Sequence, residues 1–268
     1  MMKKFAVLGN PINHSLSPQI HLEFARQLEI SLSYVKKTVP LDSFEKIVSE
    51  LKNDKFYGAN VSLPFKSHAA KIAQRKSNEV IDTHSANTLT FLGDYIKADS
   101  TDGMGLLADL ENKIGSIVNT KILLLGAGGA ANAVIPALHK NHINQLFLWN
   151  RTIQKSYDMQ LFWSKKYSHL AVMENIDLAD IDLIINATSA GVDSQVSPIQ
   201  INTSNKDLVC YDMMYGQKTP FLQLAQKKNL THFDGLGMLV QQAALSFEIW
   251  HQMKVDTNKI EAGLRLTI

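Results

Sequence analysis

The stretch Leu123-Leu124-Leu125-Gly126-Ala127-Gly128-Gly129-Ala130-Ala131 decides the fold of this chain. It matches G-x-G-x-x-A, directly after an apolar run typical of a buried strand and directly before a helical pattern. Gly126 permits a tight turn, Gly128 lets the backbone approach a pyrophosphate, and Ala131 keeps the helix close to the sheet. Free N–H groups at the helix start would bind phosphate. The stretch predicts a Rossmann-like dinucleotide site; a tight turn without a ligand is the alternative.

The end of the next expected strand, 145–149, indicates which dinucleotide binds. Asn150-Arg151-Thr152 follows it, with Lys155 one helical turn later. NAD enzymes place an acidic residue here to bind the ribose 2′-hydroxyl. A carboxylate would repel a 2′-phosphate, whereas a guanidinium binds it with paired hydrogen bonds. The sequence therefore predicts NADP. Alternatively, Asn150 and Thr152 only cap a helix and Arg151 is a solvated surface charge.

Outside this motif, short apolar runs alternate with helical patterns, which predicts an α/β protein with two parallel sheets. Gly93-Asp94 between two strands indicates a hairpin, and Ser17 before Pro18 is expected to cap a helix. We expect one domain over 1–103 and 236–268, to which the last helix returns, and a Rossmann-like domain over 104–235. The expected strands are 5–8, 34–39, 57–61, 88–92, 95–98, 121–125, 145–149, 182–186 and 208–212. One helix is expected to begin at Ser17. The other expected helices cover 44–51, 104–110, about 129–139, 152–163 and 236–250.

Composition excludes several classes of protein. The 268 residues are 45% hydrophobic with a net charge of +2, and no block of Lys and Arg indicates nucleic-acid binding. The single cysteine, Cys210, lies in an apolar run, so we expect a buried thiol and no disulfide. No histidine has acidic or cysteine partners at ligand spacing, so no metal is predicted. No run approaches the ~20 apolar residues of a membrane span, which predicts a soluble cytoplasmic protein. We separately expect a monomer or a homodimer.

Polar motifs follow several expected strands of the first domain. Ligands of open α/β sheets bind beyond the carboxyl ends of strands, so these motifs should converge. Each also has a local explanation, as a helix cap, a turn residue or a solvated charge. Together they offer hydroxyls, an amide, an ammonium and a carboxylate, which suits a small polyhydroxylated acid. The motifs are Asn13-His14-Ser15-Leu16-Ser17-Pro18, Asn60-Val61-Ser62-Leu63-Pro64-Phe65-Lys66, Ala86-Asn87-Thr88 and Ser100-Thr101-Asp102-Gly103.

From Phe5 to about Trp250, these motifs in this order resemble the shikimate dehydrogenase family. Ser62 stands where the family usually has Thr, and Lys155 where it usually has Arg. The remaining stretches that carry the resemblance are Gly9-Asn10-Pro11, Gly126 to Ala130, Asn150-Arg151-Thr152, Asn186-Ala187-Thr188-Ser189, Tyr211-Asp212-Met213-Met214-Tyr215 and Asp234-Gly235-Leu236-Gly237-Met238.

The resemblance implies reduction of 3-dehydroshikimate to shikimate with NADPH, a step toward chorismate and the aromatic amino acids. It implies that Ser15, Ser17 and Tyr215 hold the substrate carboxylate. It implies that Ser62, Lys66, Asn87, Asp102 and Gln242 hold the substrate hydroxyls. The implied cofactor contacts are Gly126, Ala127, Gly128, Gly129, Ala130, Asn150, Arg151, Thr152 and Lys155, with Thr188, Met213 and Gly235 near the nicotinamide.

The chemistry suits these residue types. Hydride transfer to a ketone leaves an alkoxide that needs a proton, and Lys66 can give it while Asp102 pairs with the ammonium. The two form a coupled pair, so either can be named the formal base. Two alternatives stay open: a quinate/shikimate dehydrogenase with relaxed specificity, and a non-catalytic NADP-binding regulator that kept the fold.

Overall fold

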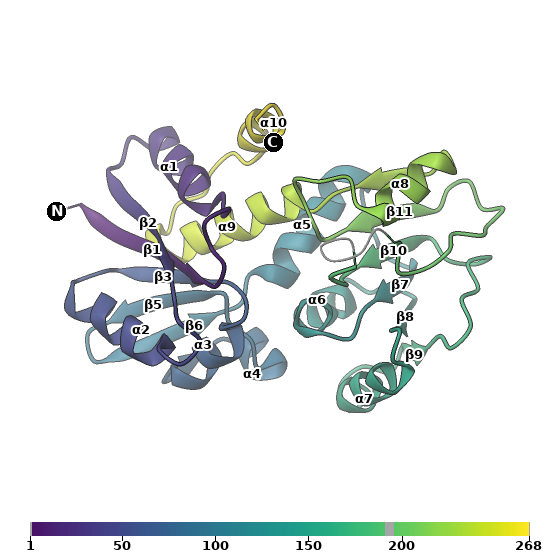
Figure 1. Ribbon diagram of the computed structural model, residues 1–268, viewed down its shortest axis with the longest axis horizontal. Coiled ribbons are helices and arrows are strands. Elements are labelled where there is room, and N and C mark those ends of the chain that lie inside the picture. Colours follow the sequence, from purple (N-terminus) through teal and green to yellow (C-terminus); the bar gives the residue numbers. More distant parts are fainter. Residues whose placement is uncertain (1, 191–195, 268) are drawn as a thin grey trace. The chain divides into compact units, whose positions relative to one another are not determined.

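The computed structural model describes residues 2–190 and 196–267. The chain forms two compact units (Figure 1). Unit 1 comprises Met1–Gly105 and Leu239–Ile268, and unit 2 comprises Leu106–Met238. The expected domain boundaries, near 103 and 235, lie within a few residues of these bounds. The chain passes between the units inside two helices, α5 (Asp102–Ile114) and α9 (Leu236–His251).

The sheet of unit 1 has the strand order β2-β1-β3-β5-β6-β4. It is mixed, because β5 runs antiparallel to both of its neighbours. The expected hairpin at Gly93-Asp94 is present and accounts for the antiparallel pair, since a two-residue hairpin reverses the chain. Gly93 at that hairpin has a φ of 55°. The strands are β1 (Lys3–Gly9), β2 (Leu32–Thr38), β3 (Gly58–Val61), β4 (Arg75–Lys76), β5 (Thr88–Leu92) and β6 (Tyr95–Asp99).

The first helix begins differently from the expectation. Ser17 is its first residue, Leu16 occupies the capping position, and no side chain caps the helix. Instead, the Ser17 N–H donates to Ser15 Oγ at 3.3 Å, so Ser17 is not the cap that the sequence suggested. The helices in unit 1, besides α9 and the start of α5, are α1 (Ser17–Gln27), α2 (Phe44–Asn53), α3 (Lys66–Ile72), α4 (Asn78–Thr83) and α10 (Asn258–Arg265).

The sheet of unit 2 is parallel throughout, with the order β12-β11-β10-β7-β8-β9. Read from β9, this is the 3-2-1-4-5-6 order of a doubly wound dinucleotide-binding fold. The elements are β7 (Lys121–Leu125), α6 (Gly129–Lys140), β8 (Gln145–Trp149), α7 (Ile153–Trp163), β9 (Leu170–Val172), β10 (Leu183–Asn186), β11 (Val209–Asp212), α8 (Pro220–Lys227) and β12 (Thr231–Phe233).

Strand β7 shows why its sequence is continuously apolar. Ile122 and Leu124 pack in one core cluster, and Leu123 and Leu125 in another. Alternate side chains point to opposite faces of a sheet, so both faces of this strand are buried. Cys210 in β11 is fully buried, as expected. Among the described residues, no helix is long and apolar enough to cross a membrane.

Candidate active site

Two oppositely charged side chains meet in unit 1. Lys66 is the first residue of α3, and Asp102 is the first residue of α5, three residues after the end of β6 at Asp99. Lys66 Nζ donates to Asp102 Oδ2 at 2.7 Å. A carboxylate in the first turn of a helix is favourable and an ammonium there is not, so Asp102 offsets the unfavourable place of Lys66. The Lys66 side chain stays 27% exposed, which leaves its ammonium accessible to a ligand.

The Asn87 amide joins this pair to α9. Its Oδ1 accepts from the Thr101 N–H at 3.0 Å and from Thr88 Oγ1 at 2.9 Å, which fixes the orientation of the amide. Its Nδ2 then faces three acceptors: Thr101 Oγ1 at 2.8 Å, Asp102 Oδ1 at 3.0 Å and Gln242 Oε1 at 3.1 Å. An amide carries only two hydrogens. Nδ2 therefore faces one acceptor more than it has hydrogens, and a hydroxyl group of a ligand could donate to the acceptor that is left.

A group of buried, hydrogen-bonded side chains adjoins Asn87, and none of its members was among the expected site residues. Asn60 Nδ2 donates to the backbone oxygen of Asn87 at 3.1 Å and to Ser246 Oγ at 3.0 Å. Asn60 Oδ1 accepts from the Tyr34 hydroxyl at 2.6 Å. Ser246 Oγ also lies 2.7 Å from Thr88 Oγ1. Asn60 opens one of the polar motifs of the sequence, and Ser246 is a polar residue within an apolar helical pattern, but neither was expected to take part in the site.

The expected carboxylate-binding residues are divided between the units. Ser15, in the loop between β1 and α1, donates from Oγ to Oγ of Ser17, the first residue of α1, at 3.2 Å. Ser62 follows β3, and its N–H donates to the Leu8 oxygen at 2.7 Å, so it lies beside the end of β1. Tyr215 belongs to unit 2. The structure thus brings Lys66, Asn87, Asp102 and Gln242 into one hydrogen-bonded cluster and places Ser15 against Ser17.

The glycine turn of unit 2 has the shape that a pyrophosphate requires. Gly126 has a φ of 107°, and a Cβ there would lie 3.1 Å from the Ala187 oxygen, so only glycine fits without strain. At Gly128 and Gly129 a Cβ would meet no atom within 4 Å, so the backbone at the start of α6 borders open space. Ala131 is fully buried, which lets α6 pack closely on the sheet. These features fit a phosphate group at the N-terminus of α6.

The turn after β8 carries two exposed cations. Asn150 Nδ2 donates to the Thr152 oxygen at 2.9 Å and so holds the turn, while the Thr152 side chain makes no capping bond to α7. The alternative that Asn150 and Thr152 cap this helix is therefore wrong, because neither side chain accepts a bond from an N–H group of α7. Arg151 and Lys155 are exposed and form no ion pair with any described residue. Both cations can therefore bind an anion.

Thr188, Met213 and Gly235 belong to three segments of unit 2 that contact one another. The Thr188 N–H donates to Asn186 Oδ1, the Met213 N–H to the Asn186 oxygen, and the Gly235 N–H to the Met214 oxygen. Asp212 lies beneath these segments. Burial raises the pKa of its carboxyl above the usual value, and hydrogen bonds from Thr219, Met214 and Asn186 oppose that shift.

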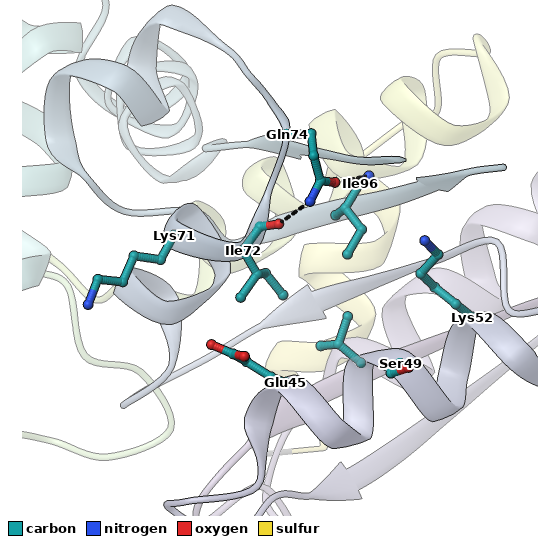
Figure 2. A pocket seen from close by; sticks show the side chains of 8 residues that line it. Glu45, Ser49, Lys52, Lys71, Ile72, Gln74 and Ile96 are labelled. Atoms are coloured by element: carbon teal, nitrogen blue, oxygen red, sulfur yellow. Dashed lines mark hydrogen bonds between the residues drawn. The ribbon is translucent and has the colours of Figure 1, made fainter. Parts of the chain in front are cut away.

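A large cavity in unit 1 does not coincide with the candidate site. It has a volume of about 610 Å³ and lies between α2, α3 and β6. In Figure 2, Gln74 joins two other lining residues by donating to the Ile72 oxygen and accepting from the Ile96 N–H. Its lining contains none of the expected site residues; it consists of Glu45, Val48, Ser49, Lys52, Lys71, Ile72, Gln74 and Ile96. No group of three His, Cys, Asp or Glu side chains among the described residues could hold a metal ion.

Three family models match successive parts of the chain. A model of the shikimate dehydrogenase substrate binding domain matches residues 7–89. A shikimate / quinate 5-dehydrogenase model matches residues 109–205, and a model of the shikimate 5′-dehydrogenase C-terminal domain matches residues 235–265.

Whole-chain relatives agree with these matches. The chain is 41% identical over 267 residues to a protein of Vesicomyosocius okutanii named shikimate dehydrogenase (NADP(+)), covering 98% of this chain and 100% of the relative. A protein of Methylobacillus flagellatus with the same name is 40% identical, with 98% and 99% covered. The crystal structure of shikimate 5-dehydrogenase from Thermus thermophilus in complex with NADP(H) and shikimate is 30% identical, with a TM-score of 0.88 and 100% of both chains covered.

Proposed function

This chain belongs to the shikimate dehydrogenase family, and on that premise we propose that it reduces 3-dehydroshikimate reversibly to shikimate with NADPH, in the synthesis of chorismate and the aromatic amino acids. The observation that carries this proposal for the chain itself is the cluster of unit 1. In it, an accessible ammonium is held 2.7 Å from a buried carboxylate, and that carboxylate also accepts from the Asn87 amide, which contacts the Gln242 amide.

The hydrogen-bonding capacity of this cluster supports a polyhydroxylated substrate. Asp102 offers only acceptors and Lys66 only donors, whereas Asn87 and Gln242 offer both. A hydroxyl donates one hydrogen bond and can accept others, so a hydroxyl on a ring can donate to the acceptor for which Asn87 has no hydrogen. The Ser15 and Ser17 hydroxyls can donate to a carboxylate elsewhere on the same ring. We assign Tyr215 and Ser62 to the substrate from the family motif.

The Lys66–Asp102 pair supplies the proton chemistry. Bound NADPH provides the hydride that attacks the ketone carbon. Lys66 Nζ donates a hydrogen bond to the ketone oxygen, stabilises the negative charge that develops there, and gives the proton that completes the hydroxyl. Asp102 holds the ammonium in place through its 2.7 Å bond. In the reverse direction the pair accepts the hydroxyl proton as one coupled unit.

Unit 2 holds the cofactor in this proposal. The backbone from Gly126 to Ala130 and the N-terminus of α6 bind the pyrophosphate. Arg151 and Lys155 bind the 2′-phosphate, with Asn150 and Thr152 shaping the turn that presents them. Two accessible cations and no carboxylate in that turn favour NADP over NAD. We also expect a cytoplasmic monomer or homodimer.

The decisive experiment is an absorbance assay at 340 nm with the purified chain, in which shikimate or quinate is paired with NADP or NAD. We expect fast reduction of NADP with shikimate and much slower reduction in the other three combinations. Comparable rates with quinate would favour the relaxed quinate/shikimate enzyme, a class that one matching family model also names. Absence of turnover in all four combinations, with NADP still binding, would favour the non-catalytic regulator.

A further inference from the structure

A continuous set of hydrogen bonds links the three loops of unit 2 that carry Thr188, Met213 and Gly235. Thr188 donates to Asn186 Oδ1 from its N–H at 3.1 Å and from its hydroxyl at 2.7 Å. Asn186 Nδ2 donates to Asp212 Oδ2 at 3.1 Å. The Met214 N–H donates to Asp212 Oδ1 at 3.0 Å, and the Met214 oxygen accepts from the Gly235 N–H at 2.8 Å. The set therefore runs through every loop that the family motif assigns to the nicotinamide.

Asp212 is the centre of this set. It is fully buried at the end of β11, as is Asn186 at the end of β10. Its Oδ2 also accepts from the Thr219 hydroxyl at 2.6 Å, and that hydroxyl caps α8 by accepting from the Leu222 N–H. One carboxylate thus accepts from two loops and one helix cap. A carboxylate can accept all three bonds at once, whereas an amide presents hydrogens on one side.

The backbone leaves little freedom for these loops to settle elsewhere. A Cβ on Gly235 would lie 2.3 Å from the Met213 oxygen, so the 213–215 and 234–237 segments already touch at backbone distance. Any change in the direction of the Met214 N–H therefore moves Met213 and Gly235 together.

We propose that Asp212, acting with Asn186, is a positioning residue that holds the nicotinamide half of the cofactor site in shape without touching the cofactor. This inference rests on the proposed function, because that function assigns Thr188, Met213 and Gly235 to the nicotinamide. It implies that two separate groups of residues contribute to the affinity for the cofactor. The glycine turn, Arg151 and Lys155 bind the adenosine half, and the hydrogen bonds around Asp212 affect binding of the nicotinamide half only.

The test replaces Asp212 by Asn, which keeps the volume of the side chain and removes one acceptor oxygen. Two ligands are compared by titration: NADP, and adenosine 2′,5′-bisphosphate, which lacks the nicotinamide. We expect Asp212→Asn to lower kcat/KM for NADPH on the order of a hundredfold, as misplacement of about 1 Å does. Affinity for NADP should fall, while affinity for adenosine 2′,5′-bisphosphate should stay unchanged. The primary isotope effect with 4-deuterated NADPH should rise, because hydride transfer becomes slower.

Asp207→Asn is the matched control, because Asp207 is an exposed carboxylate close to the other end of β11. It should change neither affinity nor kcat. Equal loss of both ligands in Asp212→Asn would overturn the inference, and so would unchanged kcat and NADP affinity. If Asp212→Asn does not fold, Asn186→Ser provides the same comparison, because it removes only the link between Asp212 and the Thr188 loop. If the wild-type chain does not oxidise shikimate, the proposed function fails, while the comparison of the two ligands still tests Asp212.

Discussion

The ammonium of Lys66 and the carboxylate of Asp102, 36 residues apart in the chain, form a 2.7 Å hydrogen bond between the first residues of two helices. Helix α3 follows strand β3 and helix α5 follows strand β6, each after a short loop, and both strands belong to the same sheet. The pair therefore lies where polar groups of an α/β sheet gather, and Asn87 keeps the second carboxylate oxygen of Asp102 occupied at 3.0 Å.

Replacing Lys66 by Ala should lower kcat by about 10²–10⁴-fold, the usual contribution of a positioned proton donor. The Michaelis constant for shikimate should change little, because the other donors and acceptors of the cluster remain. Initial rates at 340 nm measure both constants. Lys71→Ala, an exposed lysine in the last turn of the same helix, should behave as wild type. Near-normal kcat in Lys66→Ala would remove Lys66 from the mechanism.

Arg151→Asp should discriminate between the two nicotinamide cofactors. The new carboxylate repels a 2′-phosphate and can accept a hydrogen bond from a 2′-hydroxyl, so NADPH binding should weaken far more than NADH binding. Titration of each cofactor against the variant and wild type measures the ratio. Lys227→Asp, at an exposed residue of α8, makes the same charge change away from this turn and should leave the ratio unaltered. Equal weakening of both cofactors would contradict the assignment of Arg151 to the 2′-phosphate.

Gly237 is packed against a buried carboxylate, so a side chain there should destabilise the protein. A Cβ would lie 2.0 Å from Asp109 Oδ1, and Asp109 is held by the Tyr211 hydroxyl at 2.7 Å. Gly237→Ala should lower the free energy of unfolding by about 1–3 kcal/mol, the usual cost of overpacking. Gly263→Ala is the contrasting variant, because its Cβ would meet no atom within 4 Å inside α10. It should raise stability by up to about 1 kcal/mol through helix propensity. Urea unfolding measures both, and a neutral Gly237→Ala would show that Asp109 can move away.

His21 should make the protein lose stability in acid. It is 1% exposed and stacks on Tyr34 with ring centroids 4.4 Å apart. Burial, and the nearby His251, lower the pKa of His21 from 6.5 to about 3. Between these values the unfolded chain binds a proton that the folded chain excludes. The contribution of neutral His21 to the free energy of unfolding is therefore fully present above pH 6.5. Between pH 6.5 and about 3 it falls by about 1.4 kcal/mol for each unit by which the pH is lowered.

His21→Phe keeps an aromatic ring at this position and removes the titrating group. The difference in unfolding free energy between about pH 7.5 and about pH 5 should be smaller in this variant than in wild type. His14→Gln, at an exposed histidine, should leave the difference as it is in wild type. An unchanged difference in His21→Phe would mean that other groups cause the acid sensitivity.

Local patterns predicted the elements that are long or continuously apolar. Strand β7 and the glycine turn into α6 were recognisable because both faces of a central parallel strand are buried and the turn needs glycine. The Gly93-Asp94 hairpin was equally clear. The short elements were missed: α3, α4, α8, α10, β4, β9 and β12 are each short, and several show a polar pattern that loops share. Thr219-Pro220 at the start of α8 was a capping signal that could have been read.

The class of fold, the dinucleotide turn, the family and the residue types of the candidate site could be inferred from the chain alone, because they depend on local backbone requirements and on motifs in a fixed order. Which side chains meet depends on the folded arrangement of distant segments. The Asn87–Gln242 contact joins residues 155 apart, and the orientation of the Asn87 amide depends on Thr88 and Thr101. Hydrogen bonds of this kind require distances near about 3 Å and a defined direction, and no periodicity along a chain encodes them.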